Sequence, residues 1–557
     1  RRRAEFIARQ NTSKPNFEVD IYDIYSELEK ICYLKKEDAE KEIVLEEEIC
    51  YANPYMLEVF NLLKKKGKTL IATSDMYLPS KVIKAILEKN GFVGLDRIFV
   101  SCEHGYNKGS GALFEIVKKE YPNARTFAHI GDNEEADMKG AQKAGVVGFY
   151  YENCNNFGNC LRPQKLYSPI GQMYKGVVNN YFYNGLCNDT ARESFAFLYA
   201  GPIVVGYCEW INEFVKNNNL DKILFMARDM DIFYKTYNKF YKKYDNEYVV
   251  TSRFALQECL YADFTNEILF HTLLSRSDRG YTIEKAFNEL NLSFLLDKLP
   301  SRLNRKSYIF GSNLQDVQNV IRDNIDAVTD YFKDNETAAK LYFKSMIGEA
   351  KKICIVDLGW RGSIIAYLEY LLVRKWKLCD EVKGVLLGST RSEAAVNLIS
   401  RGVVTTYAYD HIHNRDMVRP DGDIEFSTVL VLESIFTSEG NSLVEYHLNK
   451  SNNSVEFLTY EDNPNKDIIR EFHIGIEKFV EEFEKYRSKY RKYLPMSAVD
   501  AYEPMNVILN CNEYVARIIG DVLDTPYQVA GLNIPIKKYV SIGQILLEKG
   551  IINKWPF

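Results

Sequence analysis

The sequence predicts an α/β protein in which a helical segment precedes a doubly wound parallel sheet, and a second α/β region with helical insertions follows. Two observations predict this. Between Lys68 and Tyr150, short apolar runs alternate with amphipathic stretches, as strands and helices do in a parallel sheet. The alternation returns after residue 190, with longer helical stretches between the apolar runs. At 557 residues the chain is too long for one compact core, so we expect two or three domains.

Residues 1–60 have the apolar periodicity of helices, with a new helix starting at Pro54. In residues 61–155 the period changes to that of an α/β sheet. Its predicted strands are 69–73, 97–101, 126–130 and 146–150, and its predicted helices are 80–90, 109–120 and 134–144.

Residues 156–190 are rich in Asn and Gly and are predicted to form a linker. A second α/β domain is predicted for residues 191–450, and residues 451–557 are predicted to be mostly helical. The strands expected in the second domain are 222–227, 247–251, 352–356 and 382–387.

The composition excludes several classes of protein. The net charge of −5 comes from 71 basic and 76 acidic residues mixed along the chain, which argues against nucleic-acid binding. The 11 cysteines include no C-x-x-C pair, so we expect reduced thiols and a cytoplasmic location. Residues 195–208 are the most apolar stretch, but Pro202 and two glycines interrupt it, and no transmembrane helix is predicted.

Candidate site residues follow the predicted strands at the edge where open α/β sheets bind ligands. Strand 69–73 is followed by Ser74 and Asp75. The Ser74 hydroxyl and the next backbone N–H groups are suited to binding a phosphate oxygen. The alternative is that Ser74 caps a helix or forms a turn.

A second candidate is Lys108, at a junction between a loop and a helix. Its ammonium group could neutralise a phosphate and the charge that develops during transfer. The alternative is a solvated surface lysine.

The third candidate is Gly131-Asp132, followed by Asp137, where a strand ends and a helix begins. Asp132 and Glu135 have the spacing of a capping box, which is the alternative interpretation. A capping box leaves Gly131 unexplained, and a glycine there permits close backbone approach to a ligand. Two neighbouring carboxylates repel unless a cation lies between them, and oxygen ligands suit Mg²⁺. The oxygen ligands of this acidic motif are therefore suited to Mg²⁺.

In order and spacing these motifs resemble those of the haloacid dehalogenase-like (HAD) hydrolase superfamily. The resemblance implies that Ser74 binds phosphate, that Lys108 stabilises charge and that Asp132 and Asp137 hold Mg²⁺. It implies phosphatase-type chemistry on a phosphorylated small molecule through an Asp nucleophile. Residues 1–60 resemble the helical cap that many members carry.

The nucleophile motif of this superfamily, a strand ending in Asp before the cap, does not occur in the chain. The chain starts at Arg1 in a helical pattern without an initiating Met, so we expect the true start to lie upstream. The D-x-D sequence at Asp229 does not replace the motif, because it follows the others. As it stands the chain is expected to be inactive. The alternative is a non-catalytic HAD scaffold or binding protein.

The second region contains a further set of strand-end polar residues. The sharpest segment is Asp357-Leu-Gly-Trp360-Arg361-Gly-Ser363, which loosely resembles the anion-binding turn of phosphoribosyltransferases. The alternative is a structural Asp357–Arg361 ion pair with Trp360 in the core. The residues of this candidate second site are Arg228, Asp229, Arg253, Asp357, Arg361 and Ser363.

The HAD-like segment combined with the segments around Arg228, Asp357 and residues 433–440 resembles large bacterial predicted hydrolases associated with surface-polysaccharide biosynthesis genes. This resemblance implies a sugar phosphate or a nucleotide-sugar as ligand. Some of these proteins are labelled glycosyltransferases, so glycosyltransferase activity in residues 190–557 is a further alternative.

Overall fold

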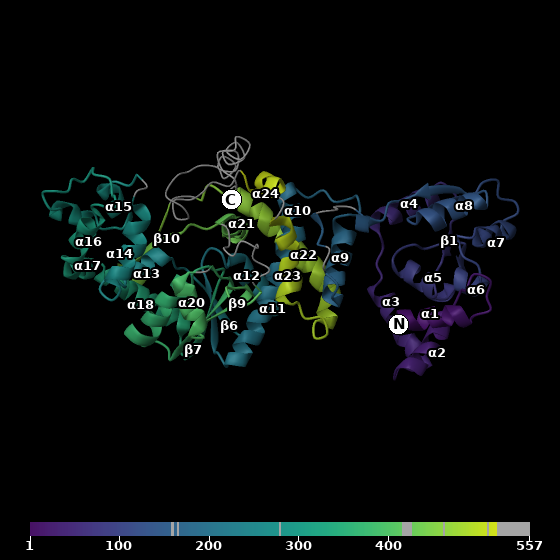
Figure 1. Cartoon of the computed structure of the whole chain (residues 1–557), viewed down its shortest axis with the longest axis horizontal. Coiled ribbons are helices and arrows are strands. Elements are labelled where there is room, and N and C mark those ends of the chain that lie inside the picture. The colour runs from purple at the N-terminus through teal and green to yellow at the C-terminus, as the bar shows by residue number, and fades with distance from the viewer. Residues whose placement is uncertain are drawn as a thin grey trace. The chain divides into compact units, whose positions relative to one another are not determined.

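A computed structural model describes residues 1–156, 161–163, 166–277, 280–390, 392–414, 426–460, 463–509 and 512–520. The chain is a mixed α/β protein with parallel sheets, and it divides into two compact units (Figure 1). Unit 1 comprises Arg1–Cys160 and Gln172–Asn188, and unit 2 comprises Leu161–Gly171 and Asp189–Phe557.

Unit 1 begins with the helices predicted for its first residues and continues with alternating strands and helices. Its strands are β1 (Ile71–Ser74), β2 (Arg97–Val100), β3 (Ala128–Gly131) and β4 (Val147–Tyr150). Its helices are α1 (Arg2–Asn11), α2 (Ile21–Ile31), η1 (Lys36–Asp38), α3 (Ala39–Ile49), α4 (Pro54–Lys65), α5 (Ser80–Lys89), α6 (Ser101–His104), α7 (Ala112–Glu120), η2 (Glu134–Lys139), α8 (Gly140–Lys143) and η3 (Cys154–Asn156). Helix α9 (Pro169–Tyr181) contains the boundary between the units.

Local signals fix the starts of these helices. Asp20 and Asp23 form a reciprocal capping box at α2. Asn53 accepts a hydrogen bond from the Met56 N–H at the start of α4, and Pro54 occupies its first position. The first helices bury apolar side chains against α5, so the helical segment and the α/β part share one core. This core contains Ala4, Ala8, Val19, Ile21, Ile24, Tyr25, Leu28, Ala39, Ile43, Leu78 and Val82.

The strands of unit 1 form two separate parallel pairs, β1 with β2 and β3 with β4. All four lie within two residues of the predicted strands. The helix predicted at 134–144 is present but begins with the wider turns of a π-helix, η2, before it continues as α8.

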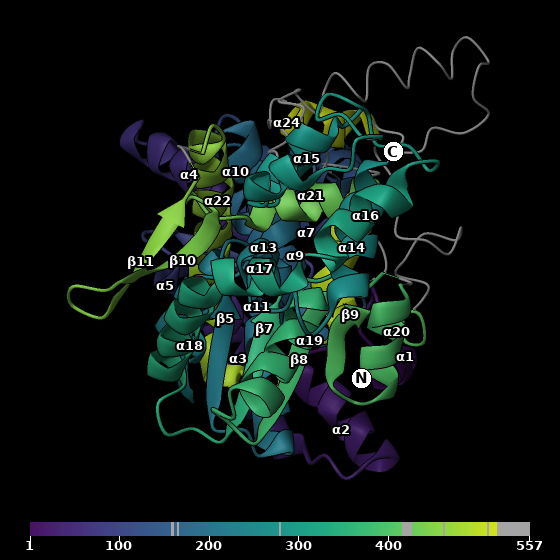
Figure 2. The ribbon, with the colours of Figure 1, turned by 90° about the vertical axis from the view of Figure 1, so that its left-hand side faces the viewer.

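Unit 2 is built on a five-stranded parallel sheet with the order β6-β5-β7-β8-β9. Figure 2 shows β5, β7 and β8 of this sheet next to one another. Its strands are β5 (Lys222–Met226), β6 (Asp245–Val249), β7 (Lys352–Asp357), β8 (Glu381–Gly388) and β9 (Val404–Tyr409). The chain adds β6 on one side of β5 and β7 to β9 on the other, so the strand order reverses between β5 and β7. The second α/β region was therefore predicted correctly, although β9 was missed.

Helices surround this sheet and extend beyond it. They are α10 (Ala191–Phe195), η5 (Ala196–Ala200), α11 (Gly201–Asn218), α12 (Asp231–Thr236), η6 (Tyr237–Tyr241), α13 (Arg253–Glu258), α14 (Thr265–Leu273), η7 (Leu274–Arg276), α15 (Ile283–Glu289), η8 (Ser293–Lys298), α16 (Leu314–Arg322), α17 (Ile325–Tyr331), α18 (Lys333–Ile347), α19 (Ser363–Leu368), η9 (Glu369–Lys375), α20 (Glu393–Ser400), α21 (Phe426–Phe436), α22 (Lys466–Arg487), η11 (Ser488–Tyr490), α23 (Ala498–Leu509) and α24 (Asn512–Ile519).

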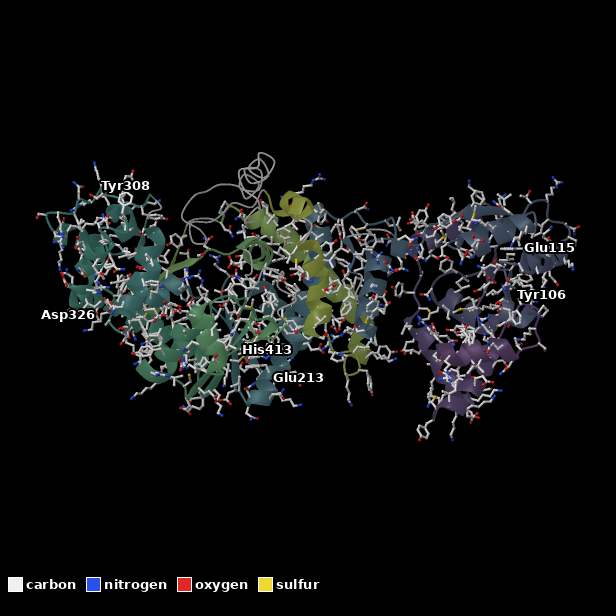
Figure 3. All side chains as sticks on the ribbon, in the orientation of Figure 1. Tyr106, Glu115, Glu213, Tyr308, Asp326 and His413 are labelled. Carbon is white, nitrogen blue, oxygen red and sulfur yellow. The ribbon has the colours of Figure 1, made fainter. Side chains whose placement is uncertain are left out.

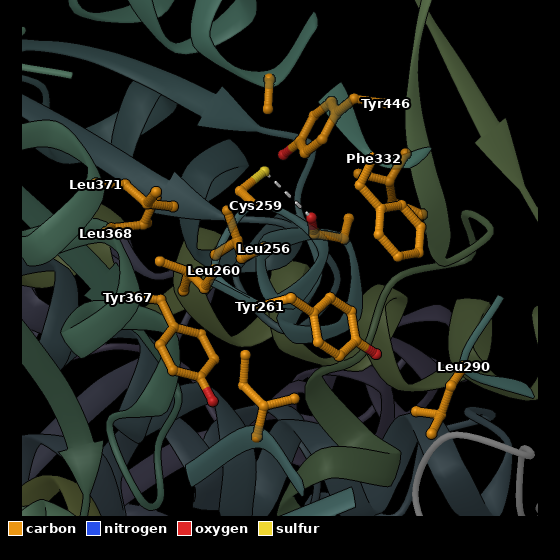
Figure 4. Close-up of a cluster of buried hydrophobic side chains, with 14 of the residues drawn as sticks. Leu256, Cys259, Leu260, Tyr261, Leu290, Phe332, Tyr367, Leu368, Leu371 and Tyr446 are labelled. Carbon is orange, nitrogen blue, oxygen red and sulfur yellow. Dashed lines mark hydrogen bonds between the residues drawn. The ribbon is translucent and has the colours of Figure 1, made fainter. Parts of the chain in front are cut away.

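The predicted helical insertion lies between β6 and β7. Helices α14 to α17 gather at one end of unit 2 (Figure 1), where Tyr308 and Asp326 project to the surface (Figure 3). Buried side chains from this insertion, from α13 and from α19 form one continuous core with the sheet. Figure 4 shows part of this core, around Leu256, Leu260 and Tyr261.

An antiparallel hairpin, β10 (Leu443–Asn449) and β11 (Ser454–Thr459), was not predicted. The expected division between residues 450 and 451 falls inside this hairpin, and helix α22 packs against α10, η5 and α11 of the same unit. Of the predicted helical C-terminal part, residues 461–462, 510–511 and 521–557 lie outside the described residues.

One helical run, Ala191–Asn218, is long and apolar enough to cross a membrane, but 89% of its most apolar window is buried inside the protein. It therefore has the environment of a core helix. Pro202 does not end it, because the wider π-turn η5 precedes the proline and Pro202 occupies the first turn of α11.

Candidate functional sites

The candidate residues of unit 1 lie at the carboxyl ends of β1 and β3. Ser74 is the last residue of β1, and Asp132 follows Gly131, the last residue of β3. Lys108 lies in the loop between α6 and α7, which Gly105 begins and Gly111 ends with positive φ angles of 75° and 82°. These conformations favour glycine, and they turn the loop so that it can bring Lys108 to the strand ends.

Lys108 and Asp137 form the centre of a hydrogen-bonded network. Lys108 Nζ lies 2.5 Å from Asp137 Oδ1, and His129 Nε2 lies 2.9 Å from the same oxygen. The other ring nitrogen of His129 lies 3.3 Å from the Thr73 hydroxyl of β1. The Lys108 side chain is 14% exposed and that of Asp137 is 3% exposed. The alternative of a solvated Lys108 is therefore wrong.

Electrostatics explain why Asp137 is a stable partner for Lys108. Burial alone would raise the pKa of Asp137, but hydrogen bonds from His129, Lys108 and the Asn133 N–H outweigh it and hold this pKa well below its ordinary value. Asp137 is therefore a carboxylate at neutral pH, and it fixes the Lys108 ammonium in place.

The glycine at the end of β3 has an internal explanation. A Cβ atom on Gly131 would lie 2.3 Å from Cγ of Asp137. Gly131 is therefore needed so that the Asp137 side chain can pack against the strand. The interpretation that Gly131 admits a ligand to the backbone is unnecessary, because Asp137 fills that space.

Asp75 holds the Lys108 loop by its backbone. Its carboxylate oxygens accept hydrogen bonds of 2.8 and 3.1 Å from the Lys108 N–H. Burial raises the pKa of Asp75, and this hydrogen bond opposes the rise. Ser74 caps no helix, because α5 starts six residues later, at Ser80, and its hydroxyl has no hydrogen-bond partner among the described residues. The Ser74 hydroxyl is thus available to a ligand.

The acidic motif has fewer free carboxylate oxygens for a cation than the sequence predicted. Both Asp137 oxygens already accept hydrogen bonds, since Oδ2 bonds to the Asn133 N–H at 2.9 Å. Asp132 is exposed and bonds to the Asn153 side chain, while Asn133, not Asp132, caps the following helix. Across the described ranges no group of three His, Cys, Asp or Glu side chains is placed to hold a metal ion. Asp132 fits a Mg²⁺ ligand, and Asp137 fits a partner of Lys108.

The two strand pairs of unit 1 each leave an edge unpaired. Thr73 on β1 and His129 on β3 touch, but no described strand forms a ladder between β1 and β3. On β3 and β4 the apolar side chains of Ile130, Val147 and Phe149 are 40%, 49% and 55% exposed. A parallel sheet is normally covered on both faces, so these side chains form an uncovered apolar face of the β3–β4 pair.

The second candidate site lies in unit 2, where the strand order reverses. In open α/β sheets, ligands bind outside the carboxyl ends of the strands at such a reversal. Arg228 and Asp229 follow β5, Arg253 begins the helix after β6, and Asp357 ends β7. Arg361 lies four residues beyond Asp357. The structure thus brings together five of the six residues predicted for this site.

Arg228 is held in place by neutral partners. Its N–H donates to the Tyr248 hydroxyl at 2.9 Å, and Nη1 donates to the Ser442 hydroxyl at 2.7 Å. Its φ of 75° is unusual for a residue with a side chain. The neighbouring Asp229 has a pKa raised mainly by burial, which the charge of Arg228 partly offsets.

Three acids share this region. Burial and then the charges of Asp229 and Glu433 raise the pKa of Asp357 to about 7. Burial and the charge of Asp229 likewise raise the pKa of Glu433 to about 7. Glu433, on α21, also accepts a hydrogen bond of 3.0 Å from Trp360 Nε1. Its position was not predicted, because it lies in the middle of an apolar helix pattern far along the chain.

The alternative interpretation, an Asp357–Arg361 ion pair with Trp360 in the core, is correct for Trp360 and wrong for the ion pair. Trp360 is buried, with 7% of its surface exposed. Asp357, however, accepts from its own neighbour, the Leu358 N–H, at 2.9 Å, and no ion pair joins it to Arg361 among the residues described. A Cβ on Gly359 would lie 2.6 Å from the Gly388 carbonyl, so this glycine serves strand packing. Ser363 starts α19, and no contact of its side chain with the acids is seen.

Among known proteins, no family model matches this chain and no curated sequence matches it. The function of both sites is therefore inferred from their own residues.

Proposed function

We propose that unit 1 is a phosphoryl-transfer module of the HAD type, acting on a phosphorylated small molecule. The observation that carries the proposal is that Asp75, which follows Ser74 at the end of β1, binds the Lys108 N–H, while Asp137 after β3 binds the Lys108 ammonium. A hydroxyl can donate a hydrogen bond to a phosphate oxygen, and a fixed ammonium group can neutralise the phosphate charge. Both groups suit a phosphate-binding site.

Each residue has a distinct part in this proposal. Ser74 donates to a phosphate oxygen, and Lys108 neutralises its charge and the charge that develops in the transition state. Asp137 orients Lys108, and Asp75 holds the loop through the Lys108 N–H. When bound, Mg²⁺ would neutralise further phosphate charge, and Asp132 is the described residue best placed to hold it.

The reaction also needs a nucleophile, which we place on a strand between β1 and β3. The unpaired edges of these two strands support such a strand, and its carboxyl end would lie beside Ser74 and Asp132. An Asp there would attack phosphorus and would add an oxygen ligand for the metal ion. The chemistry is thus proposed for a protein that contains this strand.

The test is a phosphatase assay of the protein encoded by the full reading frame, with Mg²⁺ and a panel of sugar phosphates. We expect Lys108→Met to lower kcat/KM by roughly 10²- to 10³-fold, the loss seen when one charge-stabilising donor is removed. Lys119→Met, at an exposed site on α7, is the matched control and should leave turnover unchanged. Equal turnover in both variants would overturn the proposal.

The second candidate is a non-catalytic scaffold. It is favoured by one observation, that the Asp137 oxygens are already filled by internal hydrogen bonds. If Asp132→Asn leaves the assay above unchanged and the intact protein shows no metal-dependent turnover, the scaffold function is the better account.

A further inference from the structure

Three arginines lie at the carboxyl edge of the unit 2 sheet, and two of them have no ion-pair partner among the described residues. Arg228, Arg253 and Arg361 come from three different strand ends beside the reversal of strand order. Arg228 bonds to a hydroxyl and lies next to Asp229. Among the described residues, neither Arg253 nor Arg361 makes a side-chain hydrogen bond or an ion pair, and both side chains are exposed.

Other positive charges lie near Arg253. Burial lowers the pKa of Arg253, and the nearby charge of Arg361 lowers it further. Its side chain therefore reaches solvent while protein crowds it closely. Arg276 is a third guanidinium nearby, and Glu433 is the carboxylate that acts on Arg253. Like charges held together in this way repel, and a bound anion would relieve the repulsion.

The position of Arg253 on its helix gives no compensation. Arg253 is the first residue of α13, and Ser252 already caps that helix through the Ala255 N–H. A positive charge at the start of a helix is unfavourable with respect to the backbone dipoles. A structural role therefore does not account for an arginine here.

The acids of the cluster do not cancel the positive charge at neutral pH. The pKa values of Asp357 and Glu433 are both raised to about 7, mainly by burial, and the pKa of Asp229 is also raised. At pH 7 part of Asp357 and Glu433 is protonated, and the three arginines are charged. The cluster therefore has a net positive charge.

We propose that the cluster of Arg253, Arg361 and Arg228 binds the phosphoryl group of a small phosphorylated ligand at the reversal of strand order in unit 2. A guanidinium presents paired N–H donors that match two oxygens of a phosphoryl group, so two arginines can hold it on two sides. This site belongs to a different sheet from the Ser74–Lys108 site, and it does not depend on the function proposed for unit 1.

The test is isothermal titration calorimetry of the whole chain with sulfate and with inorganic phosphate as probes. Arg253→Gln and Arg361→Gln should each weaken binding at this site roughly tenfold to hundredfold, since each removes a charge-assisted contact. Arg374→Gln is the matched control: Arg374 lies at the far end of the same helical run as Ser363 and pairs with Glu369. Arg253→Lys keeps the charge, and we expect a smaller loss than for Arg253→Gln.

Neutralising an acid of the cluster gives a readout of opposite sign. Glu433→Gln should tighten sulfate binding roughly threefold to tenfold at pH 8, because it removes a negative charge near Arg253. The difference should vanish near pH 6, where Glu433 is protonated in the wild type, and sulfate keeps its charge over this range. The charged and titratable groups that face Glu433 and Arg253 are Arg228, Asp229, Arg276, Asp357, Arg361 and Tyr367.

The two proposals fail separately. Lys108→Met should leave the sulfate binding that depends on Arg253 unchanged, whatever its effect on unit 1. Absence of binding of either probe to the wild type, or equal affinity in Arg253→Gln, Arg361→Gln and Arg374→Gln, would overturn the proposal for unit 2. Weaker sulfate binding by Glu433→Gln than by the wild type at pH 8 would also contradict the proposal.

Discussion

The Asp137→Asn substitution tests the network that fixes Lys108. Asparagine keeps the size of the side chain, but it removes the negative charge of the carboxylate. Its amide NH2 group would also face one of the three present donors, which are Lys108, His129 and the Asn133 N–H. Loss of a buried charged partner costs about 3 kcal/mol. We therefore expect the part of unit 1 around β3 and β4 to open more easily by about this amount.

Hydrogen–deuterium exchange is the suitable assay, because the residues that make up unit 1 include no tryptophan, so tryptophan fluorescence does not report on this unit. The amides of Val147 and Tyr151, which bond to Phe127 and Gly131, should exchange roughly a hundredfold faster at pH 7 in the variant. Glu115→Gln, at an exposed surface pair (Figure 3), should change exchange little.

The pH dependence of the same measurement has a defined sign. Because the pKa of Asp137 is lowered in the folded protein, its stabilisation is complete above the ordinary pKa of about 4 and is lost as the pH falls further. The difference between wild type and Asp137→Asn should therefore shrink below about pH 4. Equal exchange of the two proteins at pH 7 would refute the role given to Asp137.

Three further substitutions test other parts of the fold. Gly140→Ala should displace the Lys108 loop and lower stability by about 1–3 kcal/mol, because its Cβ would lie 2.1 Å from the Lys108 carbonyl oxygen; faster amide exchange in residues 101–120 is the measurement. Burial raises the pKa of Glu258 to about 8, so the wild type should lose unit 2 stability as the pH rises from about 5 to about 9. Glu258→Gln should reduce this loss, and urea midpoints followed by tryptophan fluorescence measure it. Arg487→Met should cost unit 2 about 3–5 kcal/mol in the same urea assay, because Arg487 is fully buried between Glu209 and Glu484. Arg470→Met removes an exposed pair and should leave the urea midpoint nearly unchanged.

The sheet elements of unit 1 could be predicted from sequence because their signals are local. Short β-branched runs such as residues 71–74 and 97–100 are bounded by glycines and polar turns, and the helices between them have clear apolar faces. Ser74 and Asp132 could be found because they lie at the ends of such strands, whereas Lys108 lies in a glycine-containing loop between two helices. The roles inside the site depend on contacts across the fold, such as Asp137 packing against Gly131, and these have no local signal.

The elements missed in unit 2 have weaker patterns. β9 contains two adjacent threonines, and β10 carries Glu and His within the strand, so neither has the apolar run expected of a buried parallel strand. Their place is set by partners distant in sequence, β8 for the first and β11 for the second. Glu433 was missed for the same reason, since only the folded chain brings α21 to Trp360.

The most direct measurement of the central claim is an anomalous-scattering map from crystals of the protein soaked in tungstate, a heavy-atom analogue of phosphate. The account predicts a tungstate site bonded to the Ser74 hydroxyl and the Lys108 ammonium, which Lys108→Met abolishes and Lys119→Met preserves. A map with no tungstate at Ser74 and Lys108, from crystals that bind it elsewhere, would contradict the account.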